Sequence, residues 1–101
     1  MIVVRDIFRL KFGQAKEPTA LWKEAISLLR NAGFGAANIR LLTDLAGPDY
    51  YTIILESTFN SLSEWEKAHQ SAGTNEAWKA AYAKITQYTE TGRREILSVI
   101  A

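Results

Sequence analysis

The sequence is short of several residue types on which whole classes of site depend. Its 101 residues include no cysteine, one histidine, one methionine and two prolines. Without cysteine, disulfides, thiolate nucleophiles, thiolate metal sites and iron–sulfur ligation are excluded, so packing must stabilise the fold. One histidine needs carboxylate help to bind a metal, and no acidic residue stands at a spacing that completes a zinc or iron set. We therefore expect no metal and no cofactor.

A surplus of one charge sign is also missing. Twelve Lys and Arg residues face eleven Asp and Glu residues, and no run of like charges occurs. This balance argues against a nucleic acid or an acidic membrane surface as a partner. No segment approaches the ~20 apolar residues of a membrane-spanning helix, and Arg5 interrupts the start too early for a signal peptide. We expect no membrane association and, by default, a cytoplasmic location.

Hydrophobic residues make up 48% of the chain and include three tryptophans, which is material for one core, so we expect a single domain over residues 1–101. Strict alternation of apolar and polar residues predicts four strands. They cover Ile2 to Phe12, Ile39 to Leu45, Tyr51 to Ser57 and Arg93 to Ala101. The turn residues Gly47-Pro48-Asp49 join the middle two strands as a hairpin.

Segments with helical spacing lie between the hairpin and the two outer strands. Pro18 suits the first turn of a helix that Gly33 would end in a left-handed conformation. Ser61 and Glu64 form a capping box, in which each side chain accepts from the backbone amide of the other, so a second helix starts there.

Three features divide and end this second helical stretch. Ala72-Gly73 is expected to interrupt it, Thr74 to cap its second part, and Gly92 to end it. The order is then β-α-β-β-α-β. With right-handed crossovers this is an α+β, ferredoxin-like plan, a four-stranded antiparallel sheet with helices on one face.

The uncovered face of such a sheet would mix aliphatic and charged side chains. Its aliphatic residues are Ile7, Leu42, Ile54 and Leu97, and its charged ones are Arg5, Arg9, Arg40, Glu56 and Glu95. A monomer normally avoids such a patch, and opposite charges can pair across a two-fold axis, so we expect a homodimer. The alternative is a solvated face on which the Arg stems shield the aliphatic side chains.

Asp6 is the first candidate for chemistry, because alternation places its carboxylate on the apolar face of the first strand. Thr43, Ser57 and Ser98 are its possible neighbours on other strands. A carboxylate withdrawn from water could act as a general base or acid. The alternatives are a bulge that turns Asp6 outward, or a structural carboxylate held by hydroxyls or an arginine.

His69 shares a helical stripe with Leu62 and Trp65, which points it toward the core or a pocket mouth. There an imidazole could relay a proton near neutral pH, although a structural or half-exposed role is the alternative. Large rings at helical spacing either fill the core or border an apolar cavity for a flat or greasy molecule. These candidate ligand-binding residues are Trp22, Trp65, Trp78 and Tyr82.

Three runs of residues resemble a known family. They are the run from Glu56 to Glu66, the pair Ala77-Trp78, and the run Gly92-Arg93-Arg94-Glu95-Ile96-Leu97. They resemble NIPSNAP-like proteins of the dimeric α+β barrel superfamily. The resemblance implies a homodimer whose two sheets face each other, with any ligand pocket between the sheet and helices of each subunit. Superfamily relatives include cofactor-independent monooxygenases acting on aromatic polyketide-like substrates, haem-degrading monooxygenases, isomerases and dehydratases.

The resemblance leaves the reaction open. Haem-degrading relatives use an Asn on the first strand with a helical Trp and His. Here the first strand carries Asp6, and the spacing from Trp65 to His69 is too short, so those roles are not carried over. We expect a dimer that binds a small apolar or aromatic molecule, with Asp6 and His69 as catalytic residues if it is a cofactor-independent monooxygenase or isomerase. The alternative is a non-catalytic homodimeric interaction or assembly module whose helix–sheet core is packed solid.

Overall fold

Strands and helices occupy most of residues 1–35 and 37–101, the part of the chain that the computed structural model describes. In chain order the elements are β1 (Ile2–Leu10), α1 (Lys16–Leu29), the short helical turn η1 (Arg30–Phe34), β2 (Asn38–Thr43), β3 (Thr52–Phe59), α2 (Leu62–Thr74), α3 (Glu76–Thr86) and β4 (Thr89–Ser98).

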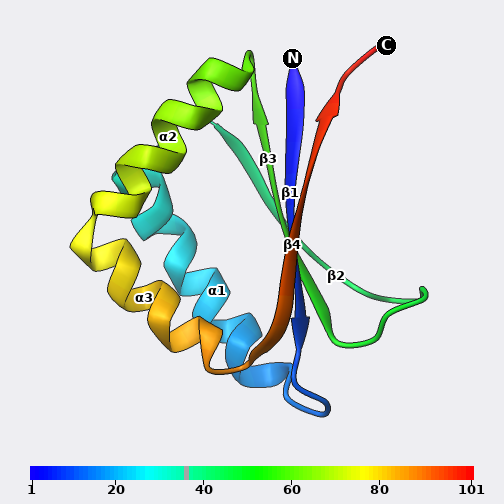
Figure 1. Cartoon of the computed structure of the whole chain (residues 1–101). Helices are drawn as coiled ribbons and strands as arrows, with labels where there is room; N and C mark the ends of the chain where they lie inside the picture. The colour runs from blue at the N-terminus through cyan, green and yellow to red at the C-terminus, as the bar shows by residue number, and fades with distance from the viewer. Residues whose placement is uncertain (36) are drawn as a thin grey trace.

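The four strands form one antiparallel sheet in the order β2-β3-β1-β4. All three long helices lie on one side of this sheet, and the other side is bare (Figure 1). The predicted ferredoxin-like α+β plan is confirmed.

The faces of β1 follow from its alternation, because successive side chains of a strand point to opposite sides. Val4, Phe8 and Leu10 are buried beneath the helices. The strand is shorter than predicted, since its pairing with β4 shifts at Arg9/Leu10 and the chain then turns. Phe12 lies beyond the strand and is 86% exposed, so the predicted extension of the strand to Phe12 is wrong.

Gly33 adopts the left-handed backbone predicted for it, with φ of 137°. It lies within η1, after α1 has ended at Leu29. A Cβ at this position would lie 2.8 Å from the Cβ of Ser71, so glycine also allows η1 to pack closely on α2.

Only one of the two hydrogen bonds of the predicted capping box is present at the start of α2. The Ser61 hydroxyl accepts from the Glu64 amide at 3.2 Å, but the Glu64 carboxylate accepts from the Asn60 amide at 3.3 Å and not from Ser61. The predicted division of this helical stretch into two helices is confirmed, but the break lies at Asn75 and not at Ala72-Gly73, because α2 continues to Thr74. Asn75 then caps α3, its Oδ1 accepting from the Trp78 amide at 2.9 Å, so Thr74 is not the cap.

Gly92 does not end a helix, contrary to the prediction. The helix α3 ends at Thr86, and pairing of β4 with β1 already begins at Thr89. Gly92 lies inside β4 opposite Phe8, and a Cβ there would be 3.3 Å from the Phe8 ring. The glycine therefore leaves room for a core aromatic ring on the neighbouring strand.

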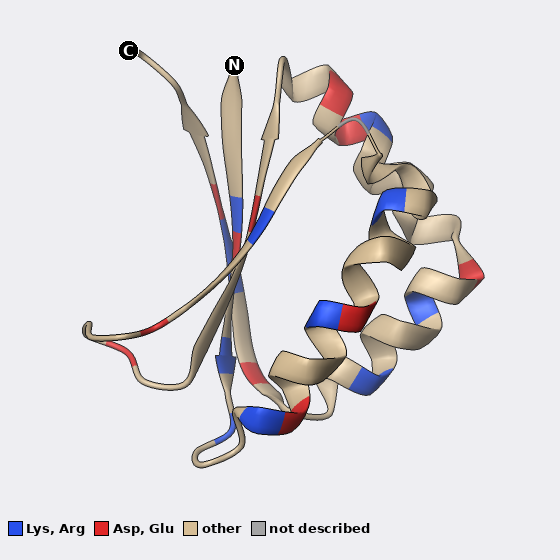
Figure 2. Cartoon of the chain, turned by 180° about the vertical axis from the view of Figure 1, so that it is seen from behind, with Lys and Arg blue, Asp and Glu red and all other residues tan. Residues whose placement is uncertain are grey.

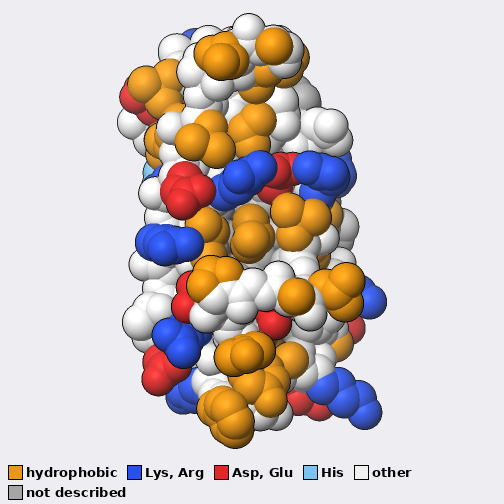
Figure 3. Space-filling view, turned by 90° about the vertical axis from the view of Figure 1, so that its right-hand side faces the viewer, with side chains coloured by type: hydrophobic (Ala, Val, Ile, Leu, Met, Phe, Trp, Pro, Cys, Tyr) orange, Lys and Arg blue, Asp and Glu red, His pale blue; other side chains and the backbone are white. Residues whose placement is uncertain are grey.

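The bare face of the sheet carries a row of alternating charges between aliphatic side chains (Figure 3). Strand pairing places Arg40, Glu56, Arg5 and Glu95 in one cross-strand row. Seen from behind, charges of both signs meet midway along the strands, whereas on the helices they are scattered (Figure 2).

Glu56 is the centre of this row. Its carboxylate accepts from Arg5 Nε at 3.0 Å and from Arg40 Nε at 2.7 Å. Burial alone would raise the pKa of Glu56, but the hydrogen bonds and positive charges of Arg40 and Arg5 together hold that pKa below its ordinary value.

Candidate functional site

A cavity of about 520 Å³ lies between the sheet and the helices. Phe8, Trp22, Trp78 and Tyr82 give it aromatic walls, and Asp6, His69 and Arg94 are among its polar groups. The cavity opens to solvent beside His69, Gly73 and Lys79, whose side chains or backbone are exposed. Its size and lining are typical of a small-molecule site.

The aromatic walls pack through tilted and edge-on contacts. Trp22 is fully buried, and its ring centroid lies 5.2 Å from that of Phe8 and 6.1 Å from that of Trp78. The Trp78 and Tyr82 rings follow at 5.5 Å on α3. These spacings are favourable for aromatic pairs, so the wall is a packed unit rather than a set of loose side chains.

Asp6 points into the cavity from the middle of β1. It pairs with Leu55 and Arg94 across the sheet, and Arg94 Nε donates to its Oδ1 at 2.5 Å. The side chain of Asp6 is 14% exposed. Strand pairing is regular at this residue, so the alternative of an outward bulge is wrong and the alternative of an arginine partner is confirmed.

The expected hydroxyl neighbours of Asp6 stand elsewhere. Ser57 pairs with Val4, Ser98 with Ile2 and Thr43 with Ile53, so none is directly opposite the carboxylate.

Trp65 and His69 form a stack at the cavity mouth. Their ring centroids are 5.0 Å apart and their planes 17° from parallel. The guanidinium carbon of Arg94 lies 5.0 Å from the Trp65 ring centroid, close enough for a cation–π interaction. Trp65 itself does not line the cavity as predicted, because its faces are turned toward His69 and Arg94.

Tyr82 places a phenol hydroxyl in the wall of the cavity. Burial, and then the negative charge of Asp6, raise the pKa of Tyr82 above its ordinary value, against the opposing effect of Arg94. Its hydroxyl therefore stays protonated at neutral pH and can donate a hydrogen bond to an oxygen in the cavity.

The structure thus brings Asp6, His69, Trp22, Trp78 and Tyr82 to one cavity and leaves Trp65 one layer behind. Sequence reasoning missed Arg94. The signal was present, since alternation in the last strand places Arg94 on the same face as Ile96, and a cation on an apolar face needs a partner.

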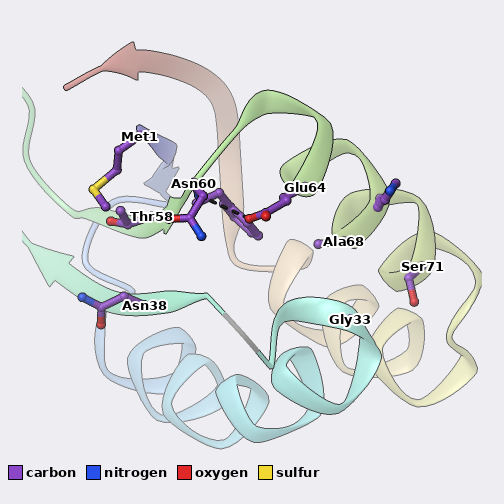
Figure 4. A pocket seen from close by; sticks show the side chains of 10 residues that line it. Met1, Gly33, Asn38, Thr58, Asn60, Glu64, Ala68 and Ser71 are labelled. Carbon is purple, nitrogen blue, oxygen red and sulfur yellow. Dashed lines mark hydrogen bonds between the residues drawn. The ribbon is translucent and has the colours of Figure 1, made fainter. Parts of the chain in front are cut away.

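A second hollow of about 670 Å³ lies at the end of the molecule where α2 begins. Figure 4 shows its side chains, with Asn38 and Thr58 on strand ends and Glu64 and Ser71 on α2. Although larger, it has no aromatic wall like that of the first cavity, and its described residues contain no buried ion pair. The aromatic cavity is therefore the better candidate site.

Among the described residues, 1–35 and 37–101, neither a metal site nor a membrane-spanning helix is found. No group of three or more His, Cys, Asp or Glu residues is placed to hold a metal ion. No helix there is long and apolar enough to cross a membrane.

No family model and no curated protein matches this sequence. Solved structures do resemble the fold. An uncharacterized NIPSNAP domain protein from Burkholderia xenovorans has a TM-score of 0.86 at 16% identity, covering 100% of this chain and 96% of that one. A NIPSNAP family protein from Agrobacterium tumefaciens has a TM-score of 0.83 at 20% identity, covering 96% and 90%.

A third similar structure is SnoaB from Streptomyces nogalater, a cofactor-independent oxygenase crystallised as a mutant. Its TM-score is 0.71 at 7% identity, covering 99% of this chain and 93% of that one. The resemblance to NIPSNAP-like proteins is therefore confirmed at the level of the fold.

Proposed function

We propose that this protein binds a small, largely apolar molecule with a flat frame in the cavity between its sheet and helices. The observation that supports this most directly is the aromatic wall of Phe8, Trp22, Trp78 and Tyr82 around a cavity of about 520 Å³. A flat ring system matches such walls in shape and polarity. The alternative, a non-catalytic module with a solid core, predicts no cavity of this kind.

The experiment is a titration with Nile red, a neutral dye, followed by dye emission and by quenching of Trp22 and Trp78. Gly73→Phe is the blocking variant, because Gly73 lines the cavity and a Cβ there meets no atom within 4 Å. The φ of Gly73 is not positive, so a side chain is tolerated in α2. Ala80→Phe, at an exposed position of α3 outside the cavity, is the matched control.

Saturable binding to the native chain that Gly73→Phe abolishes and Ala80→Phe preserves is the expected result. Equal dye binding by both variants would show that the dye binds outside the cavity, and it would refute the cavity as the binding site.

A carbon–acid reaction is the second candidate function. It is favoured by the protonated Tyr82 beside Asp6, and a fold neighbour, SnoaB, is a cofactor-independent oxygenase. Asp6 would take a proton from a carbon next to a ligand carbonyl, and Tyr82 would donate to the oxygen that becomes negative. Returning the proton to another carbon completes an isomerisation. Alternatively, dioxygen takes up the carbanion electrons, and a CH₂ group becomes C=O with release of water.

Deuterium exchange into the ligand in D₂O, followed by NMR, and oxygen uptake at an electrode test this chemistry. Both Asp6→Asn and Tyr82→Phe should abolish exchange while dye binding persists. Unchanged exchange in Asp6→Asn would exclude Asp6 as the base, leaving His69 as the remaining candidate.

A homodimer is the assembly that the bare sheet face favours. Ile7, Leu42 and Ile54 form an aliphatic band beside the charged row. Because Glu56 is already paired with Arg5 and Arg40 inside one chain, a second copy can cover the Glu56 carboxylate without leaving it unpaired. The segment between β2 and β3 also extends away from the helices (Figure 1). Its Leu45 is fully exposed.

Light scattering over a wide dilution range tests the dimer. We expect a mass near twice 11.3 kDa for the native chain and a monomer for Ile54→Lys. Ala20→Lys, on the exposed side of α1, is the control and should stay dimeric. A native monomer at all concentrations would refute this assembly.

A further inference from the structure

Arg94 occupies an unusual position for a cation, on the helix-covered face of the sheet among aromatic rings. Strand β4 places it opposite Asp6, and its side chain is 39% exposed at the cavity. Two contacts hold it there, the ion pair with Asp6 and the cation–π contact with Trp65. The guanidinium is therefore held in place before any ligand arrives.

The ion pair uses only part of the guanidinium. An arginine side chain carries five N–H donors, and the bond to Asp6 comes from Nε alone. Among the described residues, neither terminal nitrogen of Arg94 has a hydrogen-bond acceptor. These terminal nitrogens are the part of Arg94 that is available to an oxygen in the cavity.

Formal charge in the lining also favours an anion. Two cations, Lys79 and Arg94, face one carboxylate, Asp6. Lys79 has a partner in Glu76, but at 3.6 Å and with both side chains more than half exposed, so this pair is weak. A single negative charge on a ligand would balance the lining.

We propose that the ligand is a flat, apolar carboxylic acid whose carboxylate accepts hydrogen bonds from the terminal nitrogens of Arg94, with its ring system against Trp78 and Tyr82. This rests on the proposed binding function and names the class of ligand. Planar guanidinium and carboxylate groups match in geometry, and charged hydrogen bonds are stronger than neutral ones. Asp6 positions Arg94 but also competes with the ligand for it.

The test compares 2-naphthoate with 2-naphthamide, which share a ring system and differ in charge. Binding is followed by tryptophan quenching and by calorimetry. We expect the native chain to prefer the carboxylate by roughly tenfold or more, the effect of one charged hydrogen bond. Arg94→Gln should remove this preference, whereas Arg93→Gln, the next residue on the opposite face of β4, should keep it.

Asp6→Asn distinguishes this proposal from the alternative in which Asp6 itself binds the ligand. Removing the competing carboxylate should tighten 2-naphthoate binding several-fold and leave 2-naphthamide unchanged. This variant and the native comparison remain informative even if Arg94→Gln does not fold.

Equal affinity for acid and amide in the native chain, or weaker 2-naphthoate binding by Asp6→Asn, would overturn the carboxylate proposal and leave cavity binding intact. If neither compound nor Nile red binds saturably, the proposed binding function fails as well.

Discussion

Replacing Glu56 by Gln should destabilise the chain through the bare face of the sheet. Glu56 is 5% exposed, and three hydrogen bonds from Arg5 and Arg40 reach its two carboxylate oxygens. Gln keeps the shape but loses the charge, and its amide nitrogen cannot accept from an arginine.

The expected loss in the free energy of unfolding follows from how deeply Glu56 and its two arginine partners are buried. A hydrogen bond to a charged group contributes about 1.5–3 kcal/mol, and breaking a buried ion pair costs about 3–5 kcal/mol. The side chains of Arg5 and Arg40 are 40% and 64% exposed, so water rehydrates them once Glu56 is neutral. We therefore expect a loss of about 2 kcal/mol in the free energy of unfolding, below the fully buried limit.

The loss should depend on pH in one direction. The pKa of Glu56 in the folded chain lies below its ordinary value of 4.5. The ion pairs therefore stabilise the fold above that value, and their contribution disappears as the pH falls through the lower folded pKa. The native chain and Glu56→Gln should differ at pH 7 and converge in acid.

Urea unfolding at a fixed protein concentration measures this, because the stability of a dimer changes with concentration. With a denaturant slope of about 1 kcal/mol per molar, the midpoint should fall by about 2 M at pH 7. Glu95→Gln is the control, since Glu95 stands in the same row but has no ion pair with a described residue. A midpoint for Glu56→Gln equal to that of Glu95→Gln at pH 7 would refute the reasoning.

Three further predictions concern stability and are measured by the same unfolding assay. Gly33→Ala should lower the free energy of unfolding by about 2–3 kcal/mol, because φ is 137° and the new Cβ would meet Ser71. Gly73→Ala should instead stabilise α2 by up to about 1 kcal/mol. Equal effects of the two substitutions would contradict the special role of Gly33. Asn75→Ala should cost about 1 kcal/mol and Thr74→Ala clearly less, since Asn75 caps α3, and the reverse order would return the cap to Thr74. Trp22→Phe should lower the free energy of unfolding by less than about 2 kcal/mol, because the lost side-chain volume is partly offset by removing a buried indole N–H. This N–H has no acceptor among the described residues. A loss as large as that expected for truncation to Ala would show that the N–H is satisfied.

Much of the site could be predicted because it depends on the direction in which side chains point. Alternation in the first strand put Asp6 on the helix-covered face, and helical spacing put Trp22, Trp78 and Tyr82 over the sheet. Trp65 was the exception. Spacing says which face of a helix a residue shares, but not whether its ring turns toward a cavity or onto a neighbour such as Arg94.

Errors in the element boundaries have a similar cause. Glycine signals a helix end as readily as a close approach within a sheet, so the sequence predicts that Gly92 ends a helix, although the Phe8 ring on β1 accounts for this glycine. Thr74 and Asn75 are both good caps in sequence. Only the course of the backbone after α2 decides between them.

By itself, the sequence determined the order of strands and helices, the two faces of the sheet and the apolar stripe of each helix, because these follow from local repeats of two and 3.6 residues. The tertiary structure decided which distant residues meet. Asp6 and Arg94 are 88 residues apart and are neighbours because β4 returns beside β1 in one register. A shift of one residue would turn Arg94 to the bare face and place Arg93 or Glu95 opposite Asp6. The contacts that prevent such a shift join residues far apart in the sequence, so no local pattern contains them.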